Sequence, residues 1–316
     1  MSNRVDLIGV LTSSLGLVSI TYGVIEVGEQ GWSDPAALIT IFTGVLLLTG
    51  FILWERHSSH PLIDPALFRS SSFTWGSILA TIVSFAMFGL LFVTPQYFQA
   101  ALGTDALGAG LRLLPLVGGL LVGSQVTDRL QPKFGARITI AIGFVLLVIG
   151  LLIGANTGID NGYGFASIWI TIVGLGIGFV LPAAMDVAMS ALSAERSGVG
   201  SALIFALRNV GGTMGVAILG TVLSTGYRDK LDLDGLSSPV AEAALRSVSA
   251  GAAAARQIHS SELMDSVRLA FIHGMDVMLW VCGGVAALGF VLTLTFLQLK
   301  VDSQGRKELE STNMKG

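Results

Sequence analysis

The stretch ITIAIGFVLLVIGLLIGANTGI, residues 138–159, decides the fold class of this sequence. It contains no Asp, Glu, Lys or Arg, and the charged residues Arg137 and Asp160 flank it. A helix needs about 20 mostly apolar residues to cross the hydrocarbon core of a bilayer. Because lipid offers no hydrogen-bond partners to an open backbone, an apolar run of this length predicts a transmembrane helix.

The composition of the whole chain agrees with that interpretation. Of its 316 residues, 52% are apolar and 12% are charged, against about 45–50% and about 25% in soluble domains. A water-soluble enzyme is therefore excluded. The net charge of −3 argues against a nucleic-acid partner. The single cysteine, Cys282, permits neither an internal disulfide nor a cysteine metal cluster.

Other runs with few or no charges predict further spans, because the hydrocarbon core tolerates few ionised groups. The sequence predicts an all-α polytopic membrane protein with eight transmembrane helices at 7–25, 35–54, 73–96, 106–127, 138–159, 163–189, 199–224 and 277–299.

The distribution of lysine and arginine predicts the orientation of these spans, because cytoplasmic loops retain basic residues. One set of loops and termini carries Arg4, Arg56, Arg69, Arg129, Lys133, Arg137, Arg196, Lys300, Arg306, Lys307 and Lys315. The opposite short loops, 27–34, 97–105 and 156–162, carry none. We therefore expect both termini in the cytoplasm of a plasma (inner) membrane and the long segment 225–273 outside. That segment contains basic residues of its own, but long translocated loops are weak signals.

Pairs of glycines four residues apart recur in the predicted spans. This spacing puts both glycines on one face of a helix, where a second backbone can approach closely. The pattern fits helices that slide against one another, and it fits static packing equally. The residues assigned to helix packing are Gly119, Gly123, Gly174, Gly178, Gly211 and Gly215.

Three charged residues fall inside the predicted spans, where such groups are costly and by default indicate a site or pathway. Arg112 lies about 10 Å into its span at 1.5 Å per residue. Asp186 and Arg208 would lie at similar depth, and could pair, if their spans form a hairpin turning near Arg196. Alternatively, each side chain reaches to the nearest interface. Because an apolar, partly dry cavity favours a neutral carboxyl group, Asp186 could take up and release a proton there.

The sequence gives little sign of catalytic or metal chemistry. No nucleophile constellation is present, and the four histidines are scattered. His57 and His60 are three residues apart, but the intervening serines and Pro61 favour a solvated turn over a metal site. We therefore expect neither an enzyme nor a bound metal or cofactor.

Several strings carry a family resemblance. They are HPLIDPALFRSSSF (His60–Phe73), GAGLRLLPLVGG (Gly108–Gly119) and LPAAMDVAMSALSAERSGVGSALIFALRNVGGTMGVAILG (Leu181–Gly220). They resemble the C-terminal portion of the 14-span drug/proton antiporter branch of the major facilitator superfamily. The resemblance implies two central linker spans in 1–60, a cytoplasmic loop at 61–72, a six-helix C-terminal bundle at 73–299 and a cytoplasmic tail at 300–316.

The resemblance also implies a function, namely proton-coupled efflux of small amphipathic, drug-like compounds, with the proton gradient as energy source. Arg112, Asp186 and Arg208 would lie on the proton or substrate pathway. The string KFGAR looks like the family's basic cytoplasmic gating turn, with Lys133, Gly135, Arg137 and upstream Asp128, although the spacing of Asp128 departs from the family's form.

The N-terminal six-span bundle of that family has no counterpart here. Because alternating access needs two bundles that rock around a midplane site, we expect the chain to be inactive alone. It would be a fragment, would pair with a separate N-terminal half, or would pair with a second copy. The alternative is a non-transporting membrane scaffold or interaction subunit.

Overall fold

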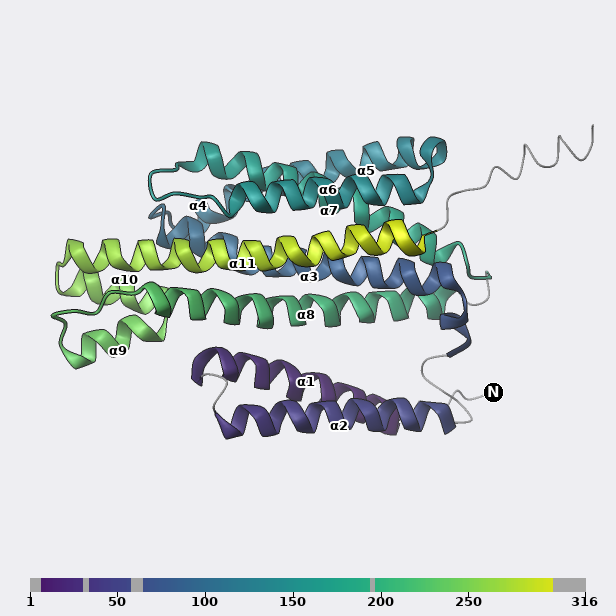
Figure 1. Cartoon of the computed structure of the whole chain (residues 1–316), viewed down its shortest axis with the longest axis horizontal. Coiled ribbons are helices and arrows are strands. Elements are labelled where there is room, and N and C mark those ends of the chain that lie inside the picture. Colours follow the sequence, from purple (N-terminus) through teal and green to yellow (C-terminus); the bar gives the residue numbers. More distant parts are fainter. Residues whose placement is uncertain (1–6, 31–33, 58–64, 194–196, 298–316) are drawn as a thin grey trace, which may run out of the picture.

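The computed structural model describes residues 7–30, 34–57, 65–193 and 197–297. These residues form helices and connecting turns, with no strand among them, and the long helices run side by side (Figure 1). The helices are α1 (Leu7–Gln30), α2 (Pro35–His57), the 3-10 helix η1 (Pro65–Arg69), α3 (Ser71–Ala100), α4 (Ala106–Leu111), α5 (Leu114–Phe134), α6 (Ala136–Gly154), α7 (Tyr163–Met189), α8 (Ser197–Lys230), α9 (Ser238–Arg246), α10 (Val248–Gln257) and α11 (Ser261–Phe296).

Long apolar helices occupy the positions of the predicted spans. In the described part of the chain, seven helices are long and apolar enough to cross a membrane, and a shorter apolar helical run, Pro35–Phe51, lies in α2. The all-helical, multi-pass membrane class predicted from the uncharged runs is confirmed. The expected loop 61–72 lies partly, and the expected tail 300–316 wholly, outside the described residues.

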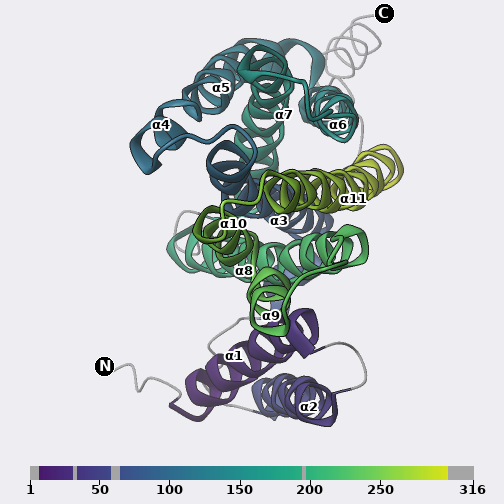
Figure 2. The ribbon, with the colours of Figure 1, turned by 90° about the vertical axis from the view of Figure 1, so that its left-hand side faces the viewer.

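Helix α3 lies at the centre of the six-span bundle and packs against α7, α8 and α11. Helix α7 packs between α5 and α6, while α11 also contacts α6 and α8. The pair α1–α2 lies to one side of this bundle (Figure 2) and contacts it mainly through α1 against α8. At that contact, the Thr221 hydroxyl donates a hydrogen bond to the carbonyl oxygen of Val24 at 3.0 Å. The α1–α2 pair is therefore peripheral to the other helices.

All six glycines assigned to helix packing lie at close helix contacts. A Cβ atom on Gly119 or Gly123 would meet the backbone of α7, at the carbonyl oxygens of Thr171 and Leu175 respectively. Gly174 and Gly178 face the backbone of α5 in the same way, and Gly211 and Gly215 face that of α3. Close backbone approach through small residues is how membrane helices gain packing energy when lipid is as apolar as their side chains.

The observed helix ends differ from the predicted span ends at the segment expected as an outer loop. Helix α8 continues to Lys230, and α11 begins at Ser261, where the Ser260 hydroxyl accepts a hydrogen bond from the Leu263 amide at 3.1 Å. Charged residues stop an apolar run without stopping a helix, so the ends of 225–273 are helical. Between them, α9 and α10 cover the ends of α8 and α11, and the Tyr227 hydroxyl donates to the carbonyl oxygen of Ala244 at 2.9 Å.

Candidate functional site

Arg208 joins three helices of the bundle. It projects from α8, and its Nε donates to the Ser84 hydroxyl of α3 at 3.2 Å. Its Nη1 approaches the thioether sulfur of Met185 in α7 at 3.5 Å. Thioether sulfur is a weak acceptor, and Arg208 is half-buried. The guanidinium therefore lies partly out of water, held by neutral groups.

Asp186 follows Met185 directly but has different surroundings. Its side chain is exposed, and its Oδ2 accepts a hydrogen bond from Nε2 of Gln131, in α5, at 3.4 Å. This distance is beyond the usual 2.7–3.2 Å for N–H donors, so the contact is weak. Asp186 therefore has an exposed carboxylate and a replaceable neutral partner.

No ion pair joins Asp186 to Arg208 among the residues that the structure describes. Helix α3 packs against both α7 and α8, which touch each other only slightly. Asp186 is also one turn from the end of α7, whereas Arg208 is about 16 Å into α8 at 1.5 Å per residue. The Arg208 side chain nevertheless reaches Met185, the residue before Asp186, so it lies at the depth of Asp186 without pairing with it, and the predicted turn at Arg196 lies outside the described residues.

Arg112 lies at a break between helices rather than within one. It is the C-terminal cap of α4, and α5 begins at Leu114 with a proline in its first turn. The guanidinium carbon of Arg112 lies 5.2 Å from the ring centroid of Tyr163. The Tyr163 ring in turn packs edge-on against Phe98, with centroids 6.0 Å apart. Arg112 therefore binds an aromatic face where the chain enters α7, a contact that favours a cation.

Asp276 in α11 is a half-buried acid that the sequence did not place among the site residues. Its Oδ1 and the Tyr97 hydroxyl of α3 are both buried and, among the described residues, have no hydrogen-bond partner. Helices α3 and α11, which carry these two side chains, pack against each other. Asp276 directly precedes the predicted span 277–299, a position that does not distinguish a buried side chain from one at the membrane surface. The signal for burial is apolar Ile272 and Leu279 on the same helical face.

The string KFGAR forms a tight turn between α5 and α6. Only Gly135 separates the two helices, and its φ of +83° is one that residues with a side chain rarely adopt. Lys133 and Asp128 are exposed. The Arg137 guanidinium donates to the carbonyl oxygen of Leu294 in α11, so this arginine connects the turn to another helix of the bundle.

Metal-binding residues do not gather in the described part of the chain. None of its His, Cys, Asp and Glu side chains form a group of three or more that could hold a metal ion. Cys282 is buried in α11. The polar groups that remain for function are those of the inner cluster, defined as Ser84, Gln131, Met185, Asp186 and Arg208, and of the outer cluster, defined as Tyr97, Arg112, Tyr163 and Asp276.

Comparisons with known sequences find transporters. A family model described as the Major Facilitator Superfamily matches residues 6–216. The tetracenomycin C resistance and export protein of Streptomyces glaucescens is 28% identical over 314 residues, which are 96% of this chain and 58% of that protein. The multidrug resistance protein Stp of Mycobacterium tuberculosis is 31% identical over 223 residues, or 71% of this chain and 41% of that protein. The match therefore spans only about half the length of these relatives.

A solved structure shares the fold. A bacterial homologue of the human lysosomal transporter Spinster, in its inward-facing and occupied conformation, superposes with a TM-score of 0.58 at 17% sequence identity. The superposition covers 92% of this chain and 66% of that one. At this identity the likeness concerns the helix arrangement alone.

Proposed function

Because the chain belongs to the Major Facilitator Superfamily, we propose that it is part of a proton-coupled multidrug efflux transporter of the 14-span drug/proton antiporter branch. It is a multi-pass protein of the plasma membrane, and its family consists of transporters rather than enzymes. The relatives named for antibiotic export and multidrug resistance support small amphipathic compounds as substrates. The proton gradient would supply the energy.

In this proposal the chain contributes one half of a transporter. Helices α1 and α2 are the two central linker spans, and α3 to α11 form the C-terminal bundle. Alternating access needs a second bundle across the substrate site, and the relatives are long enough to contain one. We propose that an N-terminal half provides it, so that the chain alone does not transport; the alternative is that a second copy of the chain provides it.

The observation that carries the proposal is the inner cluster. Asp186 is an exposed carboxylate with a weak partner in Gln131, and next to it Met185 holds the Arg208 guanidinium through a weak acceptor. A deprotonated Asp186 attracts Arg208, and a protonated one releases it. Because Arg208 also binds Ser84 of α3, this exchange would couple the proton to a rearrangement of α3, α7 and α8. Arg112 would shape the outer half of the pathway.

The first test concerns the second bundle. The DNA directly upstream of the coding sequence should encode a six-span segment, in frame or adjacent. Cells that express both parts should extrude an amphipathic cationic dye such as ethidium, and a protonophore should abolish this extrusion. Cells with the 316-residue chain alone should accumulate the dye like empty cells. If the chain alone extrudes dye, a second copy provides the second bundle and the proposed inactivity is wrong.

The second test concerns the proton. In the complete transporter, Asp186→Asn should abolish proton-driven dye efflux while leaving dye binding measurable by fluorescence. The matched control is Asp160→Asn, which makes the same change at an exposed residue between α6 and α7 and should keep full efflux. If the Asp186→Asn variant keeps full efflux, Asp186 does not carry the proton. Loss of dye binding together with efflux would make Asp186 a substrate ligand instead.

A further inference from the structure

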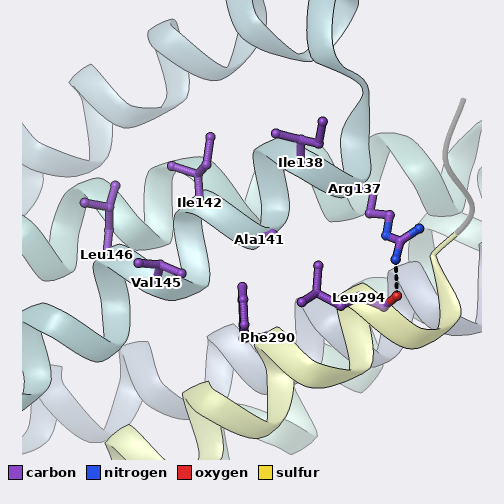
Figure 3. Close-up of a pocket in the computed structure, with 8 residues that line it drawn as sticks. All are labelled: Arg137, Ile138, Ala141, Ile142, Val145, Leu146, Phe290 and Leu294. Carbon is purple, nitrogen blue, oxygen red and sulfur yellow. Dashed lines mark hydrogen bonds between the residues drawn. The ribbon is translucent and has the colours of Figure 1, made fainter.

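An apolar groove of about 480 Å³ lies between α6 and α11 (Figure 3). Its lining comes from Ala141, Ile142 and Val145 on α6 and from Phe290 and Leu294 on α11, among others. Ile142 and Val145 are each about 40% exposed. The groove is thus an open apolar channel along two membrane-spanning helices, away from the inner cluster.

One end of this groove carries a positive charge. Arg137 is the one charged residue in its lining, and Figure 3 shows its guanidinium directed across the groove end toward Leu294, whose carbonyl oxygen accepts a hydrogen bond from it. A guanidinium has five N–H donors, so further donors remain for a ligand. The nearby start of α6 has no side-chain cap, and the free amides of a helix N-terminus favour anions.

The position of this charge selects a class of ligand. Arg137 lies on the side where the predicted loops collect lysine and arginine, which is the cytoplasmic side. The cytoplasmic leaflet carries anionic lipids, and basic pockets between membrane helices bind their headgroups. From Arg137 to Leu146 the groove follows α6 for about 13 Å at 1.5 Å per residue.

We propose that this groove is a binding site for an anionic phospholipid of the cytoplasmic leaflet. One acyl chain lies along Ile142, Val145 and Phe290, and the phosphate binds the Arg137 guanidinium at the start of α6. The apolar lining favours a lipid over free phosphate, because free phosphate would bind Arg137 and leave the apolar part of the groove without a ligand. The site is independent of transport and does not require a second bundle.

Native mass spectrometry of the full chain released from micelles tests the charge. With phosphatidylglycerol and phosphatidylcholine of identical acyl chains, the chain should retain the anionic lipid preferentially. Arg137→Gln should lower retained phosphatidylglycerol about tenfold, as expected for the loss of a charge-assisted hydrogen bond. The matched control Arg129→Gln removes the same charge at an exposed residue of α5 outside the groove and should retain the lipid.

Equal retention of both lipids, or equal loss in both variants, overturns the proposal. Displacement of the lipid by glycerol phosphate also overturns it, since a free headgroup would then suffice.

The groove itself is tested by filling it. Ala141→Phe should lower retention of both lipids, whereas Ile149→Phe, further along α6 and outside the lining, should not. Circular dichroism checks that both variants keep their helices. Unchanged retention by a folded Ala141→Phe contradicts the site.

Photocrosslinking identifies the occupant in native membranes and needs no groove-filling variant. With p-benzoyl-phenylalanine at Val145, irradiation should add the mass of an anionic phospholipid to the peptide around residue 145. A crosslink to a second chain, or to another segment of the same chain, would show that protein covers the groove and would overturn the proposal.

Discussion

Asp186 and Asp276 are two carboxyl groups within long apolar helices, at different positions in the bundle. Asp186, near the inner end of α7, is exposed and has Gln131 as a hydrogen-bond partner. Asp276, near the middle of α11, has a buried oxygen without a partner among the described residues. The bundle therefore surrounds the same chemical group differently at these two positions.

The difference in exposure distinguishes a carboxyl group that can exchange protons with its surroundings from one that packed helices partly enclose. A proton carrier must reach water in at least one state of the transport cycle, and of the two acids only Asp186 has an exposed side chain. Asp276 and Tyr97 are enclosed between packed helices, where an unpartnered polar group costs about 1–3 kcal/mol. Such a cost is tolerated when the surrounding packing is strong, which makes the surroundings of Asp276 the more rigid part of this comparison.

The largest expected effect is a difference between positions 186 and 276 in the rate at which an introduced cysteine is labelled. Cys282 is the single cysteine and is buried, so a Cys282→Ala background leaves no competing thiol. In that background, Asp186→Cys should react with a charged maleimide on the order of a hundredfold faster than Asp276→Cys, because the buried thiol must wait for local opening. Labelling rates are measured by mass spectrometry on the folded protein.

The control for this measurement is the same pair of variants in denaturant. Both thiols should then react at equal rates. Equal rates in the folded protein would mean that position 276 opens as readily as position 186, and the comparison between the two carboxyl groups would fail.

The next effect concerns the packing of α5 on α7, which holds Gln131 beside Asp186. Gly119→Ala places a methyl group against the backbone of α7 and should destabilise the protein by about 1–3 kcal/mol. Gly118→Ala, one residue earlier, meets nothing within 4 Å and should be neutral or slightly stabilising, because alanine favours helix. Thermal unfolding followed by tryptophan fluorescence compares them. Equal melting temperatures would show that α5 and α7 are not in close contact.

A smaller effect distinguishes two buried tyrosines near the outer end. The Tyr227 hydroxyl donates to the carbonyl oxygen of Ala244 at 2.9 Å, so Tyr227→Phe should cost about 0.5–1.5 kcal/mol. The Tyr97 hydroxyl has no partner among the described groups, so Tyr97→Phe should be neutral or stabilising. Unfolding midpoints in mixed micelles measure both. A larger loss for Tyr97→Phe would reveal an essential partner for its hydroxyl.

The smallest effect is expected at an exposed acid of the same helix as Asp276. Asp265 lies 4.0 Å from the Arg268 guanidinium, three residues along α11, and its side chain is 68% exposed. Asp265→Asn should change the free energy of unfolding by less than about 1 kcal/mol, as is usual for surface ion pairs. A change as large as that of Gly119→Ala would mean that the outer extension of α11 is not solvated.

Local features of the sequence predicted much of this structure. The absence of charge in 138–159 predicted a membrane helix, and α6 occupies Ala136–Gly154. The spacing of Gly174 and Gly178 indicated a face for close packing, and both face the backbone of α5. These features depend on a single helix and its solvent, which is why a sequence can reveal them.

Features that depend on which helices become neighbours were not predictable in this way. Consecutive helices α7 and α8 share α3 as a common neighbour, so Arg208 binds Ser84 rather than Asp186. The burial of Asp276 likewise depends on α3, which approaches it from far away in sequence. The roles of Asp186, Arg208 and Arg112 in a pathway remain predictions, and Asp186→Asn tests the first of them.

The central position of α3 has a consequence for how the protein is made. Its main partners α7, α8 and α11 are synthesised later, so the ribosome delivers α3 to the bilayer before they exist. Three of its hydroxyl groups already have acceptors within the helix: Thr81, Ser84 and Thr94 donate to the carbonyl oxygens of Ser77, Ala80 and Leu90 at 2.6–2.8 Å. A newly inserted α3 can therefore persist in lipid, with these groups satisfied, until its partners arrive.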